Sequence, residues 1–174
     1  MPGLIIFAII SAAIVFSSRK SLRNPRFHGF FRFFAFECVL GLFLLNMGYW
    51  FHEPFSAVHV ISWLLLLLSL IMVVYSFYLL HTEGKPRSGI ENTTTLVTRG
   101  IYKYIRHPLY SSLLLFGWGV LFKNLSLLSV CLAVVASAFL VATARVEEVE
   151  NVQKFGDDYV AYMKKTKMFI PFVI

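Results

Sequence analysis

The stretch Leu96-Val97-Thr98-Arg99-Gly100-Ile101-Tyr102-Lys103-Tyr104-Ile105-Arg106-His107-Pro108-Leu109-Tyr110 joins a polar segment to an apolar one. Arg99, Lys103 and Arg106 recur at spacings of four and three, so a helical turn would place three cations on one face. Proline suits the first turn of a helix and keeps the preceding residue extended, so we expect a break at His107 and a new helix from Pro108. The stretch predicts a functional segment, although a solvated basic collar on a membrane span explains the cations equally well.

The composition is that of an integral membrane protein. Of the 174 residues, 58% are hydrophobic and only 14% are charged. The apolar residues form blocks, in contrast to the spaced stripe of an amphipathic helix. We expect a single domain over residues 1–174. Cys38 and Cys131 both lie in apolar blocks, and the sequence has no CxxC pair and no His cluster at ligand spacing. We therefore expect packing roles for them, with no metal site and no disulfide.

Five apolar blocks predict an all-α, polytopic fold with about five transmembrane helices and a helical C-terminal tail. The short link Lys123-Asn124 makes the last two blocks antiparallel neighbours. A polar segment over 81–106, with turn residues Gly84, Pro86 and Gly89, precedes the fourth block. Trp50 ends the second block, as expected at a membrane interface, and the next link, His52-Glu53-Pro54-Phe55, has no Lys or Arg. The blocks are 2–16, 33–51, 58–80, 108–122 and 125–142.

Positive charge is confined to three segments. Fifteen of the 16 Lys and Arg residues fall in the first loop, the third loop and the tail, and Lys123 is the remaining one. This bias predicts a cytoplasmic C-terminus and an N-terminus outside. The first block is short for a span, and without it the N-terminus would be cytoplasmic. Topology thus explains the net charge of +7, and we expect no nucleic-acid partner.

The tail carries the second group of chemically interesting residues. Gly156 is a natural end for the last long helix, and Asp157-Asp158 predicts the start of a short one that carries Tyr159 and Tyr162. Acidic residues late in a helix oppose its dipole, a conflict typical of functional sites. The alternative is an exposed charged helix stabilised by a Glu150–Lys154 pair. The residues beyond the fifth block are Arg145, Glu147, Glu148 and Glu150.

Loop and tail lie on one side of the predicted membrane, so we expect His107 and the cations to face Glu147 and Glu148. Arg106-His107-Pro108-Leu109-Tyr110, then Glu147-Glu148, then Phe155-Gly156-Asp157-Asp158-Tyr159 resemble the signature of the isoprenylcysteine carboxyl methyltransferase and phospholipid methyltransferase family. The segment Leu96-Val97-Thr98-Arg99-Gly100-Ile101-Tyr102 is also similar, and the resemblance covers roughly residues 96–171.

The resemblance implies a membrane-embedded methyltransferase that uses S-adenosylmethionine and has no Rossmann domain. Carried over by position, it implies that the side chains of Tyr102, His107, Leu109 and Tyr110 contact the cofactor. Glu147 and Glu148 would then hold its cationic parts, because carboxylates stabilise a sulfonium and an ammonium where water is scarce. The sequence departs from the family pattern at Ser112 for Gly, Leu125 for Pro and Asn151 for Leu. The first could crowd the backbone near the cofactor, and the other two are expected to alter packing alone.

The reaction is an in-line displacement that needs alignment of the reactants. A carboxylate acceptor needs no general base and would be positioned by a cation, Arg145 or Arg106, as the catalytic residues. An amine acceptor, as in phospholipid N-methylation, would need deprotonation. No residue stands out as a dedicated base, so carboxyl methylation of a prenylcysteine-like lipid that enters from the bilayer is preferred.

Two other classes stay open. A sterol-type reductase with a similar tail would use a nicotinamide, but phosphates prefer cations to a Glu-Glu pair. A non-enzymatic scaffold or transporter would explain the spans and leave both motifs without a role. Glu37, in the second block, is a functional candidate because it is ionisable within the membrane, or else it pairs with Arg32 near the interface. The sequence predicts no oligomeric state.

Overall fold

The structure, a computed structural model, is all-helical over the residues that it describes, 2–52, 54–87 and 93–173. It confirms the all-α prediction and the five apolar helices, while their orientation in the membrane stays a prediction. Glu53 and Gly89, predicted to lie in a link and a turn, fall outside the described residues. The helices are α1 (Pro2–Ser18), η1 (Ser21–Arg23), α2 (His28–Asn46), η2 (Met47–Tyr49), α3 (Ala57–Thr82), η3 (Gly100–Lys103), α4 (Pro108–Leu121), α5 (Leu127–Phe155) and α6 (Asp157–Lys165).

Three helical segments are long and apolar enough to cross a membrane: His28–Tyr49, Ala57–Thr82 and Leu127–Phe155. The other two apolar helices, α1 and α4, are shorter. With 14 residues, α4 extends over about 21 Å at the helical rise, less than the roughly 30 Å of a hydrocarbon core. The predicted second block started at Phe33, but α2 begins at His28, so Arg32 lies inside the helix.

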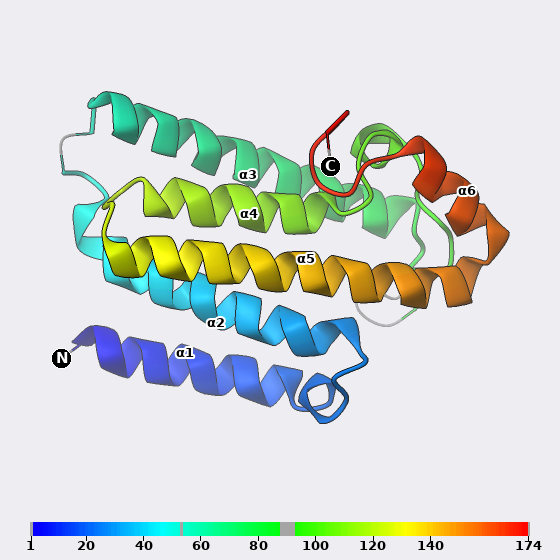
Figure 1. Ribbon diagram of the computed structural model, residues 1–174, viewed down its shortest axis with the longest axis horizontal. Coiled ribbons are helices and arrows are strands. Elements are labelled where there is room, and N and C mark those ends of the chain that lie inside the picture. The colour runs from blue at the N-terminus through cyan, green and yellow to red at the C-terminus, as the bar shows by residue number, and fades with distance from the viewer. Residues whose placement is uncertain (1, 53, 88–92, 174) are drawn as a thin grey trace.

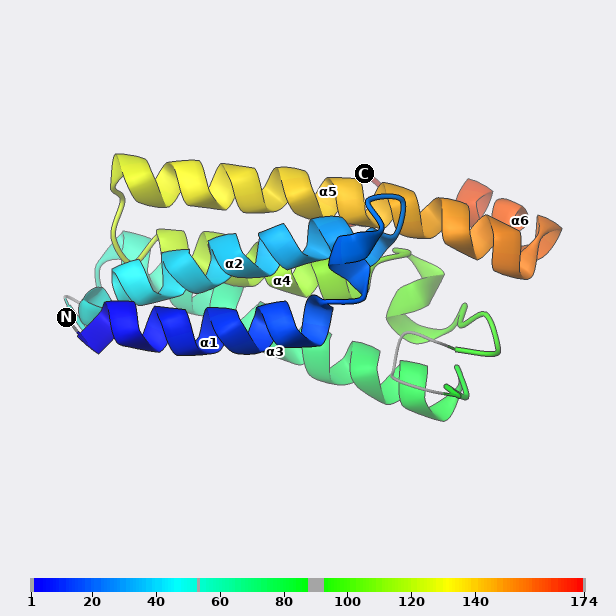
Figure 2. The same cartoon turned by 90° about the horizontal axis from the view of Figure 1, so that it is seen from below.

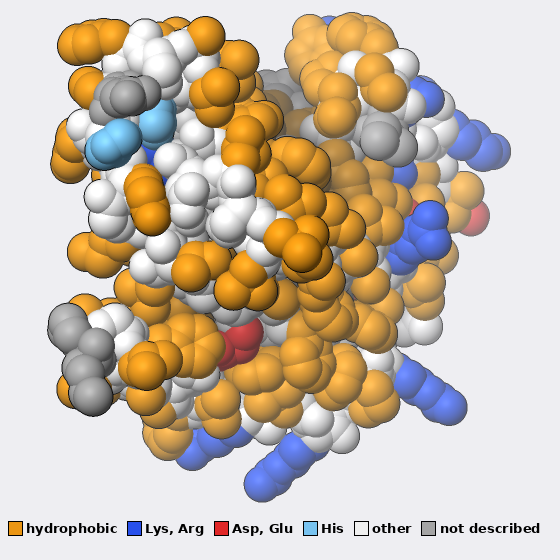
Figure 3. All heavy atoms as spheres, turned by 60° about the vertical axis from the view of Figure 1, so that its left-hand side comes forward, with side chains coloured by type: hydrophobic (Ala, Val, Ile, Leu, Met, Phe, Trp, Pro, Cys, Tyr) orange, Lys and Arg blue, Asp and Glu red, His pale blue; other side chains and the backbone are white. Residues whose placement is uncertain are grey.

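The apolar helices run side by side along one direction (Figure 1). In the two perpendicular views (Figures 1 and 2), α1 lies at the edge against α2, α2 packs against α5, and α3 packs against α4. The predicted contact between α4 and α5 is present. From α5 the chain continues into α6, beyond the end of the bundle (Figure 1). Hydrophobic side chains cover most of the face in Figure 3, and Lys and Arg side chains gather at its margin.

The ends of the helices follow their local sequence. Ser56 caps α3 by accepting a hydrogen bond from the His59 N–H, and Ser126 caps α5 by accepting one from the Ser129 N–H. Pro108 occupies the first turn of α4, as predicted. Gly156 ends α5 with a φ of 59°, a left-handed conformation that favours glycine. The chain can therefore turn sharply from α5 into α6.

Serine hydroxyls join α3 to α4. The Ser62 hydroxyl donates to the Gly119 carbonyl at 2.6 Å, and the Ser69 hydroxyl donates to the Ser112 carbonyl at 2.7 Å. Gly119 permits the close approach, because a Cβ there would lie 3.0 Å from Leu66 Cγ. Small residues and interhelical hydrogen bonds are the usual means of packing helices in lipid, where hydrophobic burial gives little driving force.

Asn46 connects three helices. Its side chain is fully buried at the end of α2, and its amide Nδ2 donates to the Val120 carbonyl of α4 at 3.1 Å. Its Oδ1 accepts a hydrogen bond from the Ser129 hydroxyl of α5, also at 3.1 Å. A buried amide whose two ends are both satisfied fixes the register of the helices around it.

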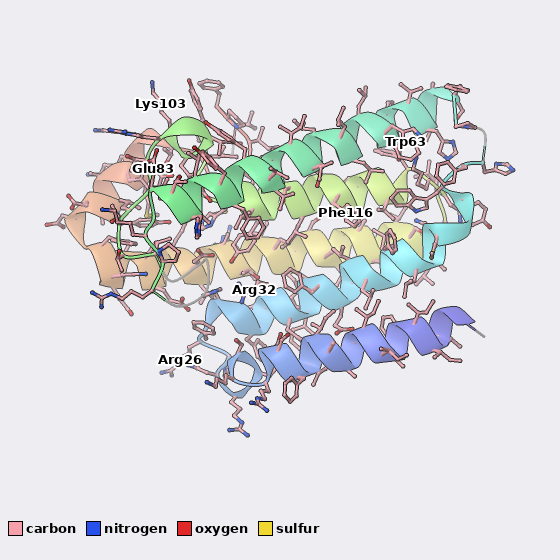
Figure 4. All side chains as sticks on the ribbon, turned by 180° about the vertical axis from the view of Figure 1, so that it is seen from behind. Arg26, Arg32, Trp63, Glu83, Lys103 and Phe116 are labelled. Carbon is pink, nitrogen blue, oxygen red and sulfur yellow. The ribbon has the colours of Figure 1, made fainter. Side chains whose placement is uncertain are left out.

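Lys123, the one cation outside the three basic segments, is buried in the turn between α4 and α5. Its ammonium Nζ lies 3.5 Å from the centroid of the Trp63 ring and 5.6 Å from that of Trp50. Burial lowers the pKa of this amine below its ordinary value. Trp63 lies near the first turns of α3 (Figure 4). Its ring and that of Trp50 therefore face the Lys123 ammonium.

Glu37 lies on α2 among aromatic neighbours. Its Oε1 atom is buried and has no hydrogen-bond partner in the described structure. The guanidinium of Arg32, the predicted partner of Glu37, lies 5.9 Å from the centroid of the Phe36 ring. The structure therefore gives this oxygen no bond to Arg32.

We expect Asn46→Leu to lower the free energy of unfolding by about 1–2 kcal/mol, because it leaves the Val120 carbonyl and the Ser129 hydroxyl unpaired. The measurement is thermal unfolding of the purified protein in detergent. Met47→Leu, at the exposed neighbouring position, is the matched control and should leave Tm unchanged. Equal Tm values for the two variants would contradict the role given to Asn46.

Candidate active site

The segment that contains η3 is held by the C-terminal tail. Ile105 and Lys167 form an isolated parallel bridge. The Arg106 N–H donates to the Lys167 carbonyl at 2.8 Å, and the His107 N–H donates to the Met168 carbonyl at 3.1 Å. The tail thus takes the backbone groups that a helix through this segment would have used internally, and His107 lies at the expected break before α4.

This pairing corrects the predicted face of three cations. Gly100 has a φ of 56°, and η3 is a short 3-10 helix, so Arg99 and Lys103 point to solvent. Figure 4 shows Lys103 projecting outward from the segment. Arg106 lies between η3 and α4, beside the tail, and its guanidinium is turned inward. Only Arg106 of the three therefore contributes to the site.

The guanidinium of Arg106 joins α5 to the tail. Its Nε donates to Glu148 Oε1 at 2.6 Å, and its Nη1 donates to the Thr166 carbonyl at 2.5 Å and the Met163 carbonyl at 3.3 Å. Both charged side chains are about nine-tenths buried. A planar fork suits such a junction, because it presents several donors in fixed directions.

The two neighbouring carboxylates have different surroundings. Glu147 lies on the surface of a cavity, and its Oε2 accepts a hydrogen bond from the Tyr110 hydroxyl at 2.5 Å. Glu148 is buried behind it, against Arg106. His107 lies between them, with Nδ1 3.9 Å from Glu147 Oε2 and Nε2 3.4 Å from Glu148 Oε1. The described structure gives His107 Nε2 no hydrogen-bond partner.

The cavity beside Glu147, which we call the carboxylate cavity, has a volume of about 80 Å³. Its walls combine the Glu147 carboxylate with apolar and tyrosine side chains. Arg106 is the one Lys or Arg among its lining residues, and that guanidinium is already bonded to Glu148. The lining residues are Leu80, Thr93, Leu96, Val97, Tyr102, Arg106, His107, Pro108, Leu109, Tyr110, Glu147, Asn151, Phe155, Tyr159 and Tyr162.

Three buried tyrosines form part of this wall. Burial raises the pKa of Tyr102, Tyr159 and Tyr162 well above the ordinary value, so all three hydroxyls stay protonated at neutral pH. The Tyr162 hydroxyl donates to the Tyr102 carbonyl at 2.7 Å and ties α6 to η3. They act as neutral hydrogen-bonding groups and aromatic surface.

A second, larger space, which we call the apolar groove, has a volume of about 780 Å³. Its surface is almost entirely apolar, and none of its lining residues is ionisable. The polar side chains on it are Ser111, Ser137 and Trp118, and the Trp118 N–H is bonded to the Ser137 hydroxyl at 3.2 Å. Helices α3, α4 and α5, η3 and the tail contribute Leu65, Leu68, Met72, Ile101, Ile105, Ser111, Leu114, Leu115, Trp118, Phe122, Ser137, Val141, Phe169, Ile170 and Pro171.

The structure brings together most of the predicted site residues. Tyr102, Arg106, His107, Leu109, Tyr110 and Glu147 all line the carboxylate cavity, with Glu148 directly behind them. Arg145 stands apart: it is exposed on α5 and lines neither space. It follows Val141, which lines the apolar groove, by one helical turn on the same face.

Other lining residues were not singled out from the sequence. Tyr159 and Tyr162 were placed on the short helix, and their three-residue spacing could have indicated a shared inward face. Asn151 was expected to affect packing alone, yet it lines the carboxylate cavity and its Nδ2 lies 3.5 Å from the Tyr159 hydroxyl. Leu80, at the end of α3, carried no signal. Ser112 lies outside the cavity, with its hydroxyl bonded to the Leu109 carbonyl.

The chain is similar to two known methyltransferases. Protein-S-isoprenylcysteine O-methyltransferase B of Arabidopsis thaliana is 36% identical over 80 residues, which are 45% of this chain and 40% of that protein. Methanethiol S-methyltransferase of Crocosphaera subtropica is 32% identical over 79 residues, 44% of this chain and 29% of that protein. The chain therefore spans less than half the length of either relative. No solved structure matches it.

The sequence profile of the phospholipid methyltransferase family matches residues 57–158, from the start of α3 into α6. That range contains η3, the start of α4, and Glu147 and Glu148 of α5, which form most of the carboxylate cavity and its surroundings, while the lining residues Tyr159 and Tyr162 lie just beyond it. Because the match covers more than half of the chain, the protein belongs to the phospholipid methyltransferase family.

Proposed function

We propose that the protein is an S-adenosylmethionine-dependent methyltransferase of lipophilic acceptors, most consistent with carboxyl methylation of a prenylcysteine-like lipid. The observation that carries the proposal is the position of Glu147, a carboxylate on the wall of a tyrosine-lined cavity that adjoins a large apolar groove. The family match and the names of the two relatives support methyl transfer.

The lining of the carboxylate cavity suits the cofactor. Glu147 would neutralise its cationic part, and the apolar side chains of Leu96 and Leu109 with the ring of Phe155 would cover its aromatic part. Tyr102 and Tyr110 supply hydroxyl groups. At about 80 Å³ the cavity is smaller than the roughly 300–1,000 Å³ of typical ligand pockets. We therefore expect the cavity to widen when a ligand binds.

When bound, S-adenosylmethionine supplies a methyl group activated by a sulfonium. The contribution of the chain is electrostatic and geometric. Glu147 offers negative charge in a partly buried site, where a charge interaction is stronger than in water. The hydrogen bond from Tyr110 orients that carboxylate, and Arg106 holds α5 against the tail. Such groups act chiefly by alignment, the main requirement of a displacement at carbon.

The apolar groove suits the hydrocarbon part of the acceptor. Its volume of about 780 Å³ is in the range of ligand pockets, and its surface lacks ionisable side chains. An acidic acceptor therefore needs a cation beyond the groove. Arg145 is the best candidate, because it follows Ser137 and Val141 along the same face of α5 and its guanidinium is exposed. Arg106, the other candidate, is already bonded to Glu148.

The uncharged lining of the groove favours a second acceptor class, a lipophilic thiol. Thiol methylation would need no cation beside the acceptor and would release the thiol proton to solvent. One of the relatives bears the name of a methanethiol S-methyltransferase. A nicotinamide-dependent reductase has less support, since its phosphates would meet Glu147 and only one cation, Arg106, which is already paired.

The test of the proposed function is calorimetry with S-adenosylhomocysteine and, separately, with a reduced nicotinamide dinucleotide, followed by a transfer assay with farnesylcysteine and dodecanethiol. We expect binding of the first ligand alone and methylation of at least one acceptor. Binding of the nicotinamide, or of neither ligand, would refute the proposal.

The two carboxylates should respond differently to neutralisation. We expect Glu147→Gln to weaken S-adenosylhomocysteine binding tenfold or more with little change in Tm, because it removes the charge that faces the cavity. Glu148→Gln should lower both the affinity and Tm, since it leaves Arg106 buried with one partner fewer. Calorimetry and thermal unfolding provide the two measurements. An unchanged affinity in Glu147→Gln would refute the assigned role.

Arg145 should matter only for an acidic acceptor. We expect Arg145→Gln to reduce kcat/KM for farnesylcysteine tenfold or more, and to leave the S-adenosylhomocysteine affinity and the transfer to dodecanethiol near wild type. Lys103→Gln, an exposed cation on η3, is the control. Equal loss with both acceptors would make Arg145 a structural residue.

The charge bias predicts that the site faces the cytoplasm. In a background without Cys38 and Cys131, we expect cysteines at Arg99 and Lys164 to react with an impermeant maleimide from the cytoplasmic side. A cysteine at His52 should react from the opposite side. If Arg99 and Lys164 label from opposite sides, the topology is wrong.

A further inference from the structure

The carboxylate cavity and the apolar groove lie on opposite sides of one wall. Neighbouring residues of the chain face different spaces: Tyr102 lines the cavity and Ile101 the groove, and Arg106 lines the cavity and Ile105 the groove. Tyr110 and Ser111 divide in the same way at the start of α4. The segment 101–111 is therefore the wall that a transferred group has to cross.

Most of this wall is hydrogen-bonded backbone. The Tyr102 carbonyl accepts from the Tyr162 hydroxyl, and the Arg106 and His107 N–H groups donate to the tail. The Ser111 N–H donates to the His107 carbonyl at 2.9 Å inside α4. An opening through these points would break buried hydrogen bonds, which is costly where no water replaces them.

Beside His107, two side-chain rings lie between the cavity and the groove. The ring of Phe169, from the tail, lies on the groove side of His107, with their centroids 6.2 Å apart and the planes at 47°. The phenyl ring is buried and has no hydrogen bond to lose. Its backbone is anchored, since the Phe169 carbonyl accepts from the Ser111 hydroxyl at 2.9 Å and the preceding Met168 carbonyl accepts from the His107 N–H. The ring packs in a core cluster with Tyr110, Leu140 and Ala144, and a change of its χ angles would leave these backbone bonds in place.

We propose that the Phe169 ring is the gate between the two spaces, and that its size sets which acceptors reach the methyl donor. The inference rests on the proposed function, because it takes the carboxylate cavity as the donor site and the apolar groove as the acceptor site. Phe169 is a positioning residue here: it opens the path beside His107 and takes part in no bond that forms or breaks.

A binding experiment tests the gate without turnover. The probe is an S-adenosylhomocysteine derivative whose sulfur carries a dodecyl chain at the place of the transferred methyl, so that it has to occupy both spaces at once. We expect Phe169→Ala to bind this probe at least tenfold more tightly than wild type and S-adenosylhomocysteine within twofold. Phe169→Trp should weaken the probe tenfold or more and leave S-adenosylhomocysteine within twofold.

Ile170→Ala is the matched control, because Ile170 lines the same groove from the same tail but is about half exposed. It should leave the affinities for both ligands near wild type. In turnover, Phe169→Ala should raise kcat/KM for a branched thiol relative to dodecanethiol at least fivefold, and Ile170→Ala should not.

Three results would overturn the gate: probe affinity that is unchanged in both Phe169 variants, parallel changes for probe and S-adenosylhomocysteine, or the same changes in Ile170→Ala. Failure of the proposed function is distinguishable from all three. In that case wild-type protein binds neither S-adenosylhomocysteine nor the probe, and the assignment of the two spaces falls together with the gate.

Discussion

The buried fork of Arg106 is the interaction on which the site depends. One guanidinium bonds the Glu148 carboxylate of α5, the Met163 carbonyl in the last turn of α6 and the Thr166 carbonyl just after it. It thereby joins α5, the residues between η3 and α4, and the tail. Removal of one partner from such a buried pair costs more than the net value of the pair, because the other charge stays desolvated. The geometry of Glu147 and His107 is set around this fixed point.

The bundle holds its own geometry by a different means. Along the apolar helices, serine hydroxyls and the Asn46 amide bond to carbonyls of neighbouring helices. In lipid such bonds replace much of the positional information that hydrophobic burial gives in water. Helix α4 is thus held between α3 and α5 although it is short, and its first turn presents His107 and Tyr110 at a defined height. The helices fix the position of the carboxylate cavity, and the tail holds the loop that forms one of its walls.

The sequence predicted the elements whose signals are local. Hydrophobic blocks located five apolar helices, Pro108 and Gly156 located the ends of α4 and α5, and the short link placed α4 beside α5. The sequence also predicted that Glu148 lies near His107, because the hairpin of α4 and α5 brings the ends that carry these two residues together. Distant pairing was not predictable: nothing in residues 99–106 indicates that Lys167 takes their backbone hydrogen bonds. Hence the expected face of three cations was wrong, and the burial of Lys123 against Trp63 was missed.

The wall formed by segment 101–111 keeps a charged surface and an apolar surface apart, although they lie close together. On one side Glu147 presents a carboxylate among tyrosines, and on the other side a surface without ionisable groups adjoins the lipid-facing helices. If the two surfaces were continuous, water drawn in by the carboxylate would reach the groove and weaken every charge interaction in the cavity. The segment 101–111 separates the two surfaces, because Tyr102 and Arg106 face the cavity while Ile101 and Ile105 face the groove. The bridge between Ile105 and Lys167, with the hydrogen bonds from Arg106 and His107 to the tail, holds the residues between η3 and α4 in place, so that one short segment lines both a polar and an apolar site.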